Sequence, residues 1–173
     1  GSAGDLYRVM NFGLKRIPGR LAVATVAGNA IFAAVTGTSL ASAAAFSRLA
    51  YPEMINAGYS RKYALGSVAG SACLGMLIPP SVLLIIWGIV TEISIGFLFL
   101  AGILPGIVLA LLMAFYSAGT AILKPEVAPN VDLSKEKLTA QEMISGGGVI
   151  FLIFAVLGSI WAGFATPSEA AAL

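Results

Sequence analysis

The chain has 173 residues, of which 58% are hydrophobic and only 10% are charged, and its net charge is +2. A soluble domain is about a quarter charged, so this composition excludes an ordinary soluble protein and indicates an integral membrane protein. Its apolar runs are far longer than the ~10-residue alternating strands of a membrane barrel. The expected fold class is therefore an all-α integral membrane protein. Histidine is absent, which removes the usual proton shuttle and the commonest metal ligand.

The first segment, residues 1–20, has apolar positions at helical spacing with basic residues between them. This pattern predicts an amphipathic helix in the membrane interface, with the end of a preceding span as the alternative. The chain starts with Gly rather than Met and ends in a new apolar run. We therefore expect an internal piece of a longer protein.

Residues 21–50 contain two apolar segments on either side of a polar centre, Thr36-Gly37-Thr38-Ser39. As helices the two segments would reach only ~21 and ~16 Å, short of a ~30 Å hydrocarbon core. We expect a re-entrant helical hairpin with its tip inside the membrane. A hairpin that enters and leaves by one face places all ten Lys and Arg residues on the cytoplasmic side, as the positive-inside rule prefers.

Residues 64–90 are apolar enough to cross a bilayer but are interrupted by Pro79, Pro80 and Ser81. Proline has no N–H donor and clashes with the preceding turn, so the helix should stop near Leu77 or Ile78 and restart after Ser81. Backbone groups freed at membrane depth require protein, water or an ion as partner, and meeting half-helices are a recurring way for transporters to build a site. A proline kink without a ligand is the alternative.

The other segments follow from the same hydropathy and charge pattern. We expect a cytoplasmic loop at 51–63, a transmembrane helix at 97–123, a cytoplasmic loop at 124–142, a transmembrane helix at 143–165 and the start of a further unit at 166–173.

The hairpin tip offers the hydroxyl groups of Thr38 and Ser39 and the backbone carbonyls around Gly37. Such hard oxygen donors suit a small cation; the alternative is a tight turn whose hydroxyls cap helix ends. Asn29 could supply an amide to the same site or bond a neighbouring helix, and Ser42 is similarly placed. No carboxylate falls inside a predicted span, which argues against a proton relay and favours a metal cation held by hydroxyls and carbonyls.

Three stretches carry a family resemblance: VTGTSLASAAAFSRLAYPEMINAGYSRKYALGSVAG, LGMLIPPSVLLIIWGIVTEISIGFLFLAGILPG and FATPSEAAAL. In these stretches the chain resembles the large membrane subunit of the tripartite ATP-independent periplasmic (TRAP) transporters. The resemblance implies an elevator-type transporter with two inverted repeats, each holding a re-entrant hairpin and a broken helix. Residues 166–173 would then begin the second repeat.

The resemblance also implies a function: sodium-coupled secondary uptake of organic acids, such as a C4-dicarboxylate, a keto acid or a sugar acid like sialic acid. The acid is delivered by a periplasmic substrate-binding protein. A small membrane subunit, separate or fused, accompanies the large one, and the assembly is a multi-pass protein of the bacterial inner membrane. Sodium is the only cofactor expected, and no nucleic acid is expected as a partner.

By position, Gly37, Thr38 and Ser39 match the Gly-Ser-Ser sodium motif of the family's hairpin, and residues 75–81 match the unwound segment that faces it. Many members carry Asp at the position of Ser42, so no charged role transfers there. The expected sodium ligands are Gly37, Thr38, Ser39, Gly75, Ile78, Pro79 and Ser81. The residues expected beside the substrate are Asn29, Ser42 and Pro80.

Two other functions compete with this one. The nearest is a sodium/dicarboxylate symporter or anion transporter of a related hairpin-containing fold, which works without a binding protein. An intramembrane serine protease using Ser39 or Ser81 would lack a histidine, and no lysine is predicted at membrane depth to act as the base. We therefore expect a transporter and not an enzyme.

Overall fold

The structure of the chain, a computed structural model, describes residues 2–14 and 17–129 together with seven separate positions between 144 and 159. Its elements, all of them helices, are α1 (Ser2–Gly13), α2 (Arg20–Thr36), α3 (Ser39–Asn56), α4 (Arg61–Ala72), the 3-10 helix η1 (Cys73–Met76), α5 (Val82–Thr91) and α6 (Ile95–Leu123). The expected all-helical fold is therefore confirmed for the described residues. The predicted segments 143–165 and 166–173, and the loop 124–142 beyond Pro129, lie largely outside them.

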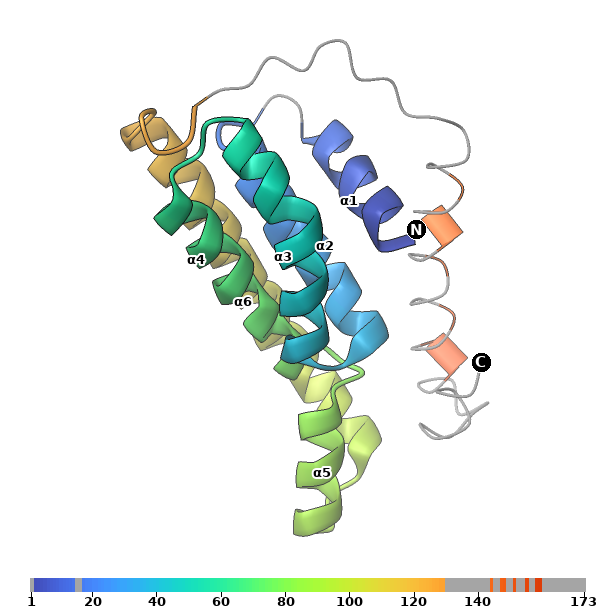
Figure 1. Cartoon of the computed structure of the whole chain (residues 1–173). Helices are drawn as coiled ribbons and strands as arrows, with labels where there is room; N and C mark the ends of the chain where they lie inside the picture. The colour runs from blue at the N-terminus through green and yellow to red at the C-terminus, as the bar shows by residue number, and fades with distance from the viewer. Residues whose placement is uncertain are drawn as a thin grey trace.

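Helices α2 and α3 form a helical hairpin that turns at Gly37 and Thr38. Helix α4 packs against both arms of the hairpin, and α6 packs along α2. Figure 1 shows these four helices side by side, with α5 continuing past the hairpin turn. The chain thus follows α4 along the hairpin, is interrupted level with the turn, and returns along the full length of the bundle in α6.

The predicted N-terminal helix is present over Ser2–Gly13 and packs on α2 and α3. Its Tyr7 is buried and meets the ring of Phe46 edge-on, with 6.1 Å between the ring centroids. Phe46 also approaches Gly28 of α2, where a Cβ atom would lie 2.8 Å from the ring. Because α2 consists mainly of small residues, its backbone can approach α1, α3, α4 and α6 closely, and most of its side chains are buried.

Several basic residues gather at one end of the bundle. Arg20, Arg61 and Lys124 lie at the start of α2, the start of α4 and the end of α6. These helix ends are joined, because the Tyr63 hydroxyl donates to the Ser117 carbonyl over 2.7 Å and the Ser60 N–H donates to the Val127 carbonyl. The α5–α6 turn at the other end contains no Lys or Arg, so the described part of the bundle has one basic end.

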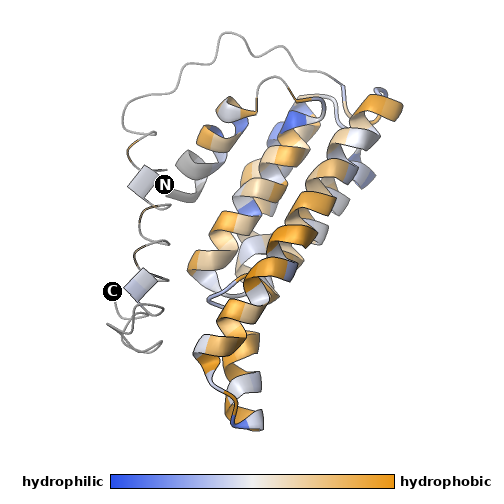
Figure 2. Cartoon of the chain, turned by 180° about the vertical axis from the view of Figure 1, so that it is seen from behind, coloured by the Kyte–Doolittle hydropathy of each residue, from blue (hydrophilic) through white to orange (hydrophobic). Residues whose placement is uncertain are grey.

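Helix α6 is the one element among the described residues that is both long and apolar enough to cross a membrane. Its 29 residues would extend ~43 Å. Large apolar side chains are exposed along α5 and α6, including Trp87, Phe97 and Phe115, and Figure 2 shows that most of the ribbon of these two helices carries the hydrophobic colour. A surface of this size marks contact with lipid or with another protein.

Candidate functional site

The hairpin turn is built by one glycine and one threonine. Gly37 has a left-handed backbone conformation with φ 63° and ends α2, where its N–H donates to the Ala33 carbonyl over 2.8 Å. Glycine adopts this conformation without steric penalty. Thr38 is extended and begins α3 as its N-cap, with its hydroxyl oxygen accepting from the Ala41 N–H over 3.4 Å. The chain therefore reverses in two residues, inside the segment 36–39 where the tip was expected.

The interruption of the second helix is longer than the proline pair alone predicts. The α-helix ends at Ala72 and tightens into the 3-10 turn η1, and regular structure resumes at Val82. The sequence had suggested a helix reaching Leu77 or Ile78. Within the interruption, the buried Ser81 hydroxyl donates to the Met76 carbonyl over 2.8 Å, so it satisfies one of the carbonyls that the broken helix leaves free.

The hairpin turn and the helix interruption touch through their backbones. The Val82 N–H donates to the Gly37 carbonyl over 3.1 Å. A Cβ atom at Gly37 would lie 2.8 Å from the Pro80 carbonyl oxygen, and one at Gly75 would lie 2.7 Å from the carbonyl carbon and oxygen of Thr38. Real Cβ atoms essentially never approach other atoms this closely, so both positions accept only glycine without a shift. The structure therefore brings the two predicted breaks together as one site.

Helix α6 supports the interruption through two further glycines that the sequence analysis did not single out. A Cβ atom at Gly102 would lie 2.9 Å from the Leu77 carbonyl oxygen, and one at Gly106 would lie 2.9 Å from Cγ1 of Ile78. Their spacing of four residues is the small-xxx-small pattern of close helix contacts in membranes. That spacing was visible in the sequence, but it did not show which element would pack there.

The positions of Gly102 and Gly106 in α6 give the distance of the site from the start of that helix. Gly102 and Gly106 lie seven and eleven residues after Ile95, which corresponds to ~10 and ~17 Å along the axis. The site therefore lies well inside the length of α6, away from both of its ends; in a helix that crosses a bilayer, this position would be inside the hydrocarbon core. Backbone groups freed there need partners from protein, water or a bound ion.

Two of the residues expected beside the substrate are fully buried. The Asn29 side-chain amide donates to the Ser71 hydroxyl of α4 over 2.7 Å, and its carbonyl oxygen has no hydrogen-bond partner. Ser42, in the first turn of α3, likewise has a buried hydroxyl without a partner. Pro80, the third expected residue, is partly exposed. Asn29 thus joins two helices, and substrate contact by these three residues stays a prediction.

The donor set at this site suits a small hard cation. The turn and the interruption present backbone carbonyls and the hydroxyls of Thr38, Ser39 and Ser81, all of them neutral oxygen ligands. The unpartnered Ser42 hydroxyl lies one helical turn beyond the tip. Among the described residues there is no group of three or more His, Cys, Asp or Glu side chains that could hold a metal. Sodium binding by the expected ligands, which also include Gly37, Gly75, Ile78 and Pro79, stays a prediction.

Comparison with protein families matches residues 1–173 to the tripartite ATP-independent periplasmic transporter, DctM component. The C4-dicarboxylate TRAP transporter large permease protein DctM of Pseudomonas aeruginosa is 36% identical over 174 residues, covering 100% of this chain and 40% of that protein. The ectoine TRAP transporter large permease protein TeaC of Halomonas elongata is 35% identical, covering 99% of this chain and 40% of that protein. The sialic acid TRAP transporter large permease protein SiaM of Vibrio cholerae is 32% identical, with the same 99% and 40% coverage.

The chain thus spans about 40% of the length of these curated relatives, and the described fold is helical with one long apolar helix, which is consistent with a membrane protein. All three relatives are named as permeases. The chain belongs to the DctM component family of the tripartite ATP-independent periplasmic transporters, a family of integral membrane transporters and not of enzymes.

Proposed function

We propose that this chain forms the first-repeat transport core of a sodium-coupled secondary transporter, which takes up organic acids delivered by a periplasmic substrate-binding protein. The observation that carries the proposal is the backbone contact between the hairpin turn and the interrupted helix, at Gly37–Val82 and Gly75–Thr38. Interrupted helices that meet near the bilayer midplane are a recurring site for substrates and coupling ions in secondary transporters.

Sodium is the proposed coupling ion because the hairpin turn and the helix interruption, the two walls of the site, offer neutral oxygen ligands. A proton relay uses Asp, Glu or His side chains inside the membrane, whereas the turn and the interruption consist of Gly, Thr, Ser, Pro and apolar residues. The proposed ligands are Gly37, Thr38, Ser39, Gly75, Ile78, Pro79 and Ser81. Ligands on both walls would make ion binding depend on the contact between them.

The proposed membrane placement follows from the depth of the site and from the basic end of the bundle. With Arg20, Arg61 and Lys124 on the cytoplasmic side, α2 and α3 form a re-entrant hairpin whose turn lies inside the bilayer, and α6 spans it in a multi-pass protein of the bacterial inner membrane. The hairpin and the broken helix pack tightly together, which suits the rigid movement of one unit in an elevator mechanism.

The proposed substrate is an organic acid, since relatives are named for C4-dicarboxylate and sialic acid. The starts of α3 and α5 both lie at the site, at Ser39 and Val82. Helix N-termini carry a partial positive charge that attracts carboxylates. In this proposal the partly exposed Pro80 contacts the acid directly, whereas the buried Asn29 and Ser42 act from behind it. The proposed partners are the binding protein and a small membrane subunit, separate or fused.

The test uses the intact transporter in proteoliposomes, with uptake of labelled organic acids followed with and without an inward sodium gradient and with and without the binding protein. We expect uptake to require both. Ser39→Ala and Pro80→Ala should lower sodium-driven uptake, whereas Ser47→Ala, an exposed serine of α3 away from the turn, should leave it unchanged. Wild-type uptake in both site variants would contradict the site. Uptake that needs sodium but not the binding protein would favour a symporter of a related hairpin-containing fold.

A further inference from the structure

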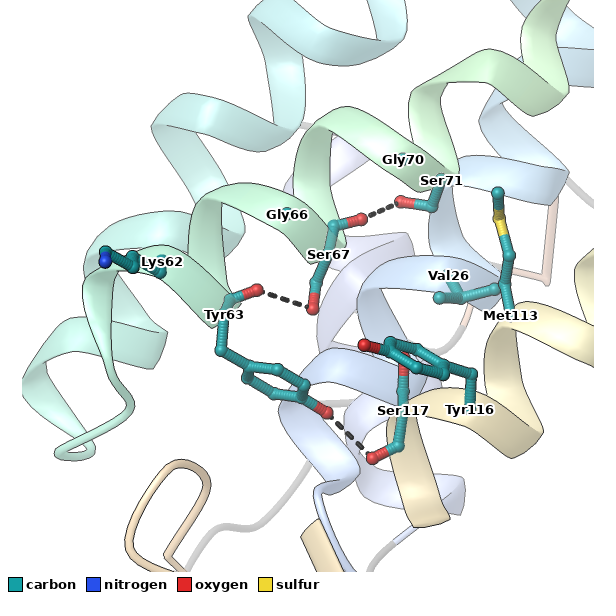
Figure 3. Close-up of a pocket in the computed structure, with 10 residues that line it drawn as sticks. All are labelled: Val26, Lys62, Tyr63, Gly66, Ser67, Gly70, Ser71, Met113, Tyr116 and Ser117. Atoms are coloured by element: carbon teal, nitrogen blue, oxygen red, sulfur yellow. Dashed lines mark hydrogen bonds between the residues drawn. The ribbon is translucent and has the colours of Figure 1, made fainter. Parts of the chain in front are cut away.

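A cavity of about 280 Å³ lies between α2, α4 and α6. Figure 3 shows its walls, with Val26 from α2, Met113 and Tyr116 from α6 and the glycines and serines of α4. Along α4 the cavity extends from Lys62 to Ser71, a distance of ~13 Å. It therefore leads from the basic end of the bundle toward the middle of the membrane, and it has no lining residue in common with the hairpin turn.

Three hydroxyl groups that line this cavity are already bonded to backbone carbonyls. Tyr63 donates to Ser117 over 2.7 Å, Ser67 donates to Tyr63 over 2.9 Å and Ser71 donates to Ser67 over 2.6 Å. Figure 3 shows these bonds. Because these protons are used within the protein, the three hydroxyls offer no free donor to a polar solute. Together with Val26, Gly66, Gly70 and Met113, these three residues form a part of the lining that favours an apolar occupant.

The α4 side of the cavity is formed by glycine backbone. Cβ atoms placed at Gly66 and Gly70 would have no protein atom within 4 Å, so both glycines face open space. Their spacing of four residues leaves a shallow groove along α4, against which a flexible hydrocarbon chain can lie. A methyl group added at either glycine would therefore not clash with the described fold.

The mouth of the cavity carries a positive charge. Lys62 is exposed and lines the cavity at its outer end. Arg61 and Lys124 lie at the same end of the bundle, where the headgroups of the inner leaflet would be. A lysine near an anionic membrane surface contributes about 1 kcal/mol of attraction. An apolar cavity with a cation at its mouth complements the two parts of an anionic phospholipid.

We infer that this cavity binds one acyl chain of an anionic membrane lipid, with the lipid phosphate beside Lys62. The acyl chain lies along Gly66 and Gly70 toward Met113, in contact with three helices at once. The site requires that the protein is in a bilayer, and it is independent of sodium coupling and of the transported substrate. A bound lipid would link α6 to the hairpin and α4.

The test measures lipid retained by the intact transporter, using native mass spectrometry after delipidation and addition of phosphatidylglycerol or phosphatidylcholine. Gly70→Leu fills the cavity, and Gly119→Leu is the matched control, because Gly119 of α6 also faces open space but does not line the cavity. We expect Gly70→Leu to reduce retained phosphatidylglycerol about tenfold, as the loss of roughly two buried methylene groups would. Gly66→Leu provides a second cavity variant if the first does not fold.

The headgroup contact is tested with Lys62→Gln, with Lys124→Gln as a control at the same end of the bundle. The preference for phosphatidylglycerol over phosphatidylcholine should fall about fivefold in Lys62→Gln and stay unchanged in the control. Equal lipid retention in Gly70→Leu and Gly119→Leu would overturn the site, and an unchanged preference in Lys62→Gln would overturn the headgroup assignment. Destabilisation of the lipid-free transporter by Gly70→Leu alone would instead show that another protein segment fills the cavity.

Discussion

Gly75 provides the sharpest test of the contact between the hairpin turn and the interrupted helix. In Gly75→Ala the added methyl carbon would lie 2.7 Å from the carbonyl carbon and oxygen of Thr38 and 2.9 Å from the Ser39 nitrogen. Ordinary contact begins near 3.4 Å, and all three atoms belong to the backbone, so no side chain can rotate away. Overpacking of this kind costs about 1–3 kcal/mol. The hairpin turn and the interrupted helix should therefore separate by about 0.7 Å to restore an ordinary contact.

The consequence for sodium follows if the ion needs both walls in contact. If the whole overpacking cost of about 1–3 kcal/mol is subtracted from the free energy of sodium binding, the half-saturating sodium concentration rises roughly 5- to 150-fold. The assay is substrate uptake into proteoliposomes over a sodium titration, with Gly119→Ala as the control because a methyl group there meets no protein atom within 4 Å. A half-saturating concentration for Gly75→Ala within about twofold of the control would refute the reasoning that the contact holds the ion site.

Three further substitutions test the surroundings of the site. Gly102→Ala places a methyl group 2.9 Å from the Leu77 carbonyl oxygen. It should lower the free energy of unfolding of the intact protein by about 1–3 kcal/mol, and a value equal to wild type would contradict this packing. Ser71→Ala removes the partner of the Asn29 amide and should lower the free energy of unfolding by about 1–3 kcal/mol in a denaturant titration. An unchanged free energy would show that α2 and α4 are held together without that bond. Ser42→Asp places a carboxylate where the hydroxyl is buried and unpartnered, so it should lower the free energy of unfolding by several kcal/mol in a denaturant titration, more than Ser42→Ala does; equal values for the two variants would contradict the burial of this position.

The elements of the site could be predicted from the sequence because each depends on local chemistry. A glycine between hydroxyl residues predicts a turn, and the prolines at 79 and 80 predict a helix interruption. The extent of the interruption could not be predicted in this way. The α-helix ends at Ala72 because η1 brings Gly75 against the Thr38 backbone, and a contact 37 residues away in sequence leaves no local signal in η1.

The pairing of the two breaks shows the same limit. Periodicity and hydropathy placed each break at membrane depth, but only the family resemblance suggested that they face each other. Gly102 and Gly106 are a clearer case, since their spacing predicts close packing without naming Leu77 and Ile78 as partners. For Asn29 the sequence left two roles open, and the structure shows the bond to a neighbouring helix.

The glycines give a physical reason why the proposed ion site would need no charged side chains. Neutral carbonyl and hydroxyl groups are individually weak ligands, so several must point at one position before they replace the water around a cation. Carbonyl groups on two separate breaks can converge only if the backbones approach to contact distance, and any side chain at Gly37 or Gly75 would prevent that approach. The backbone contact also fixes the starts of α3 and α5 beside each other at Ser39 and Val82, which directs two helix N-termini toward the proposed position of the acid. In the proposed function, one close contact would thus arrange both the ligands of the ion and the helix dipoles for the substrate, so their coupling would arise from shared geometry and would need no titratable side chain between them.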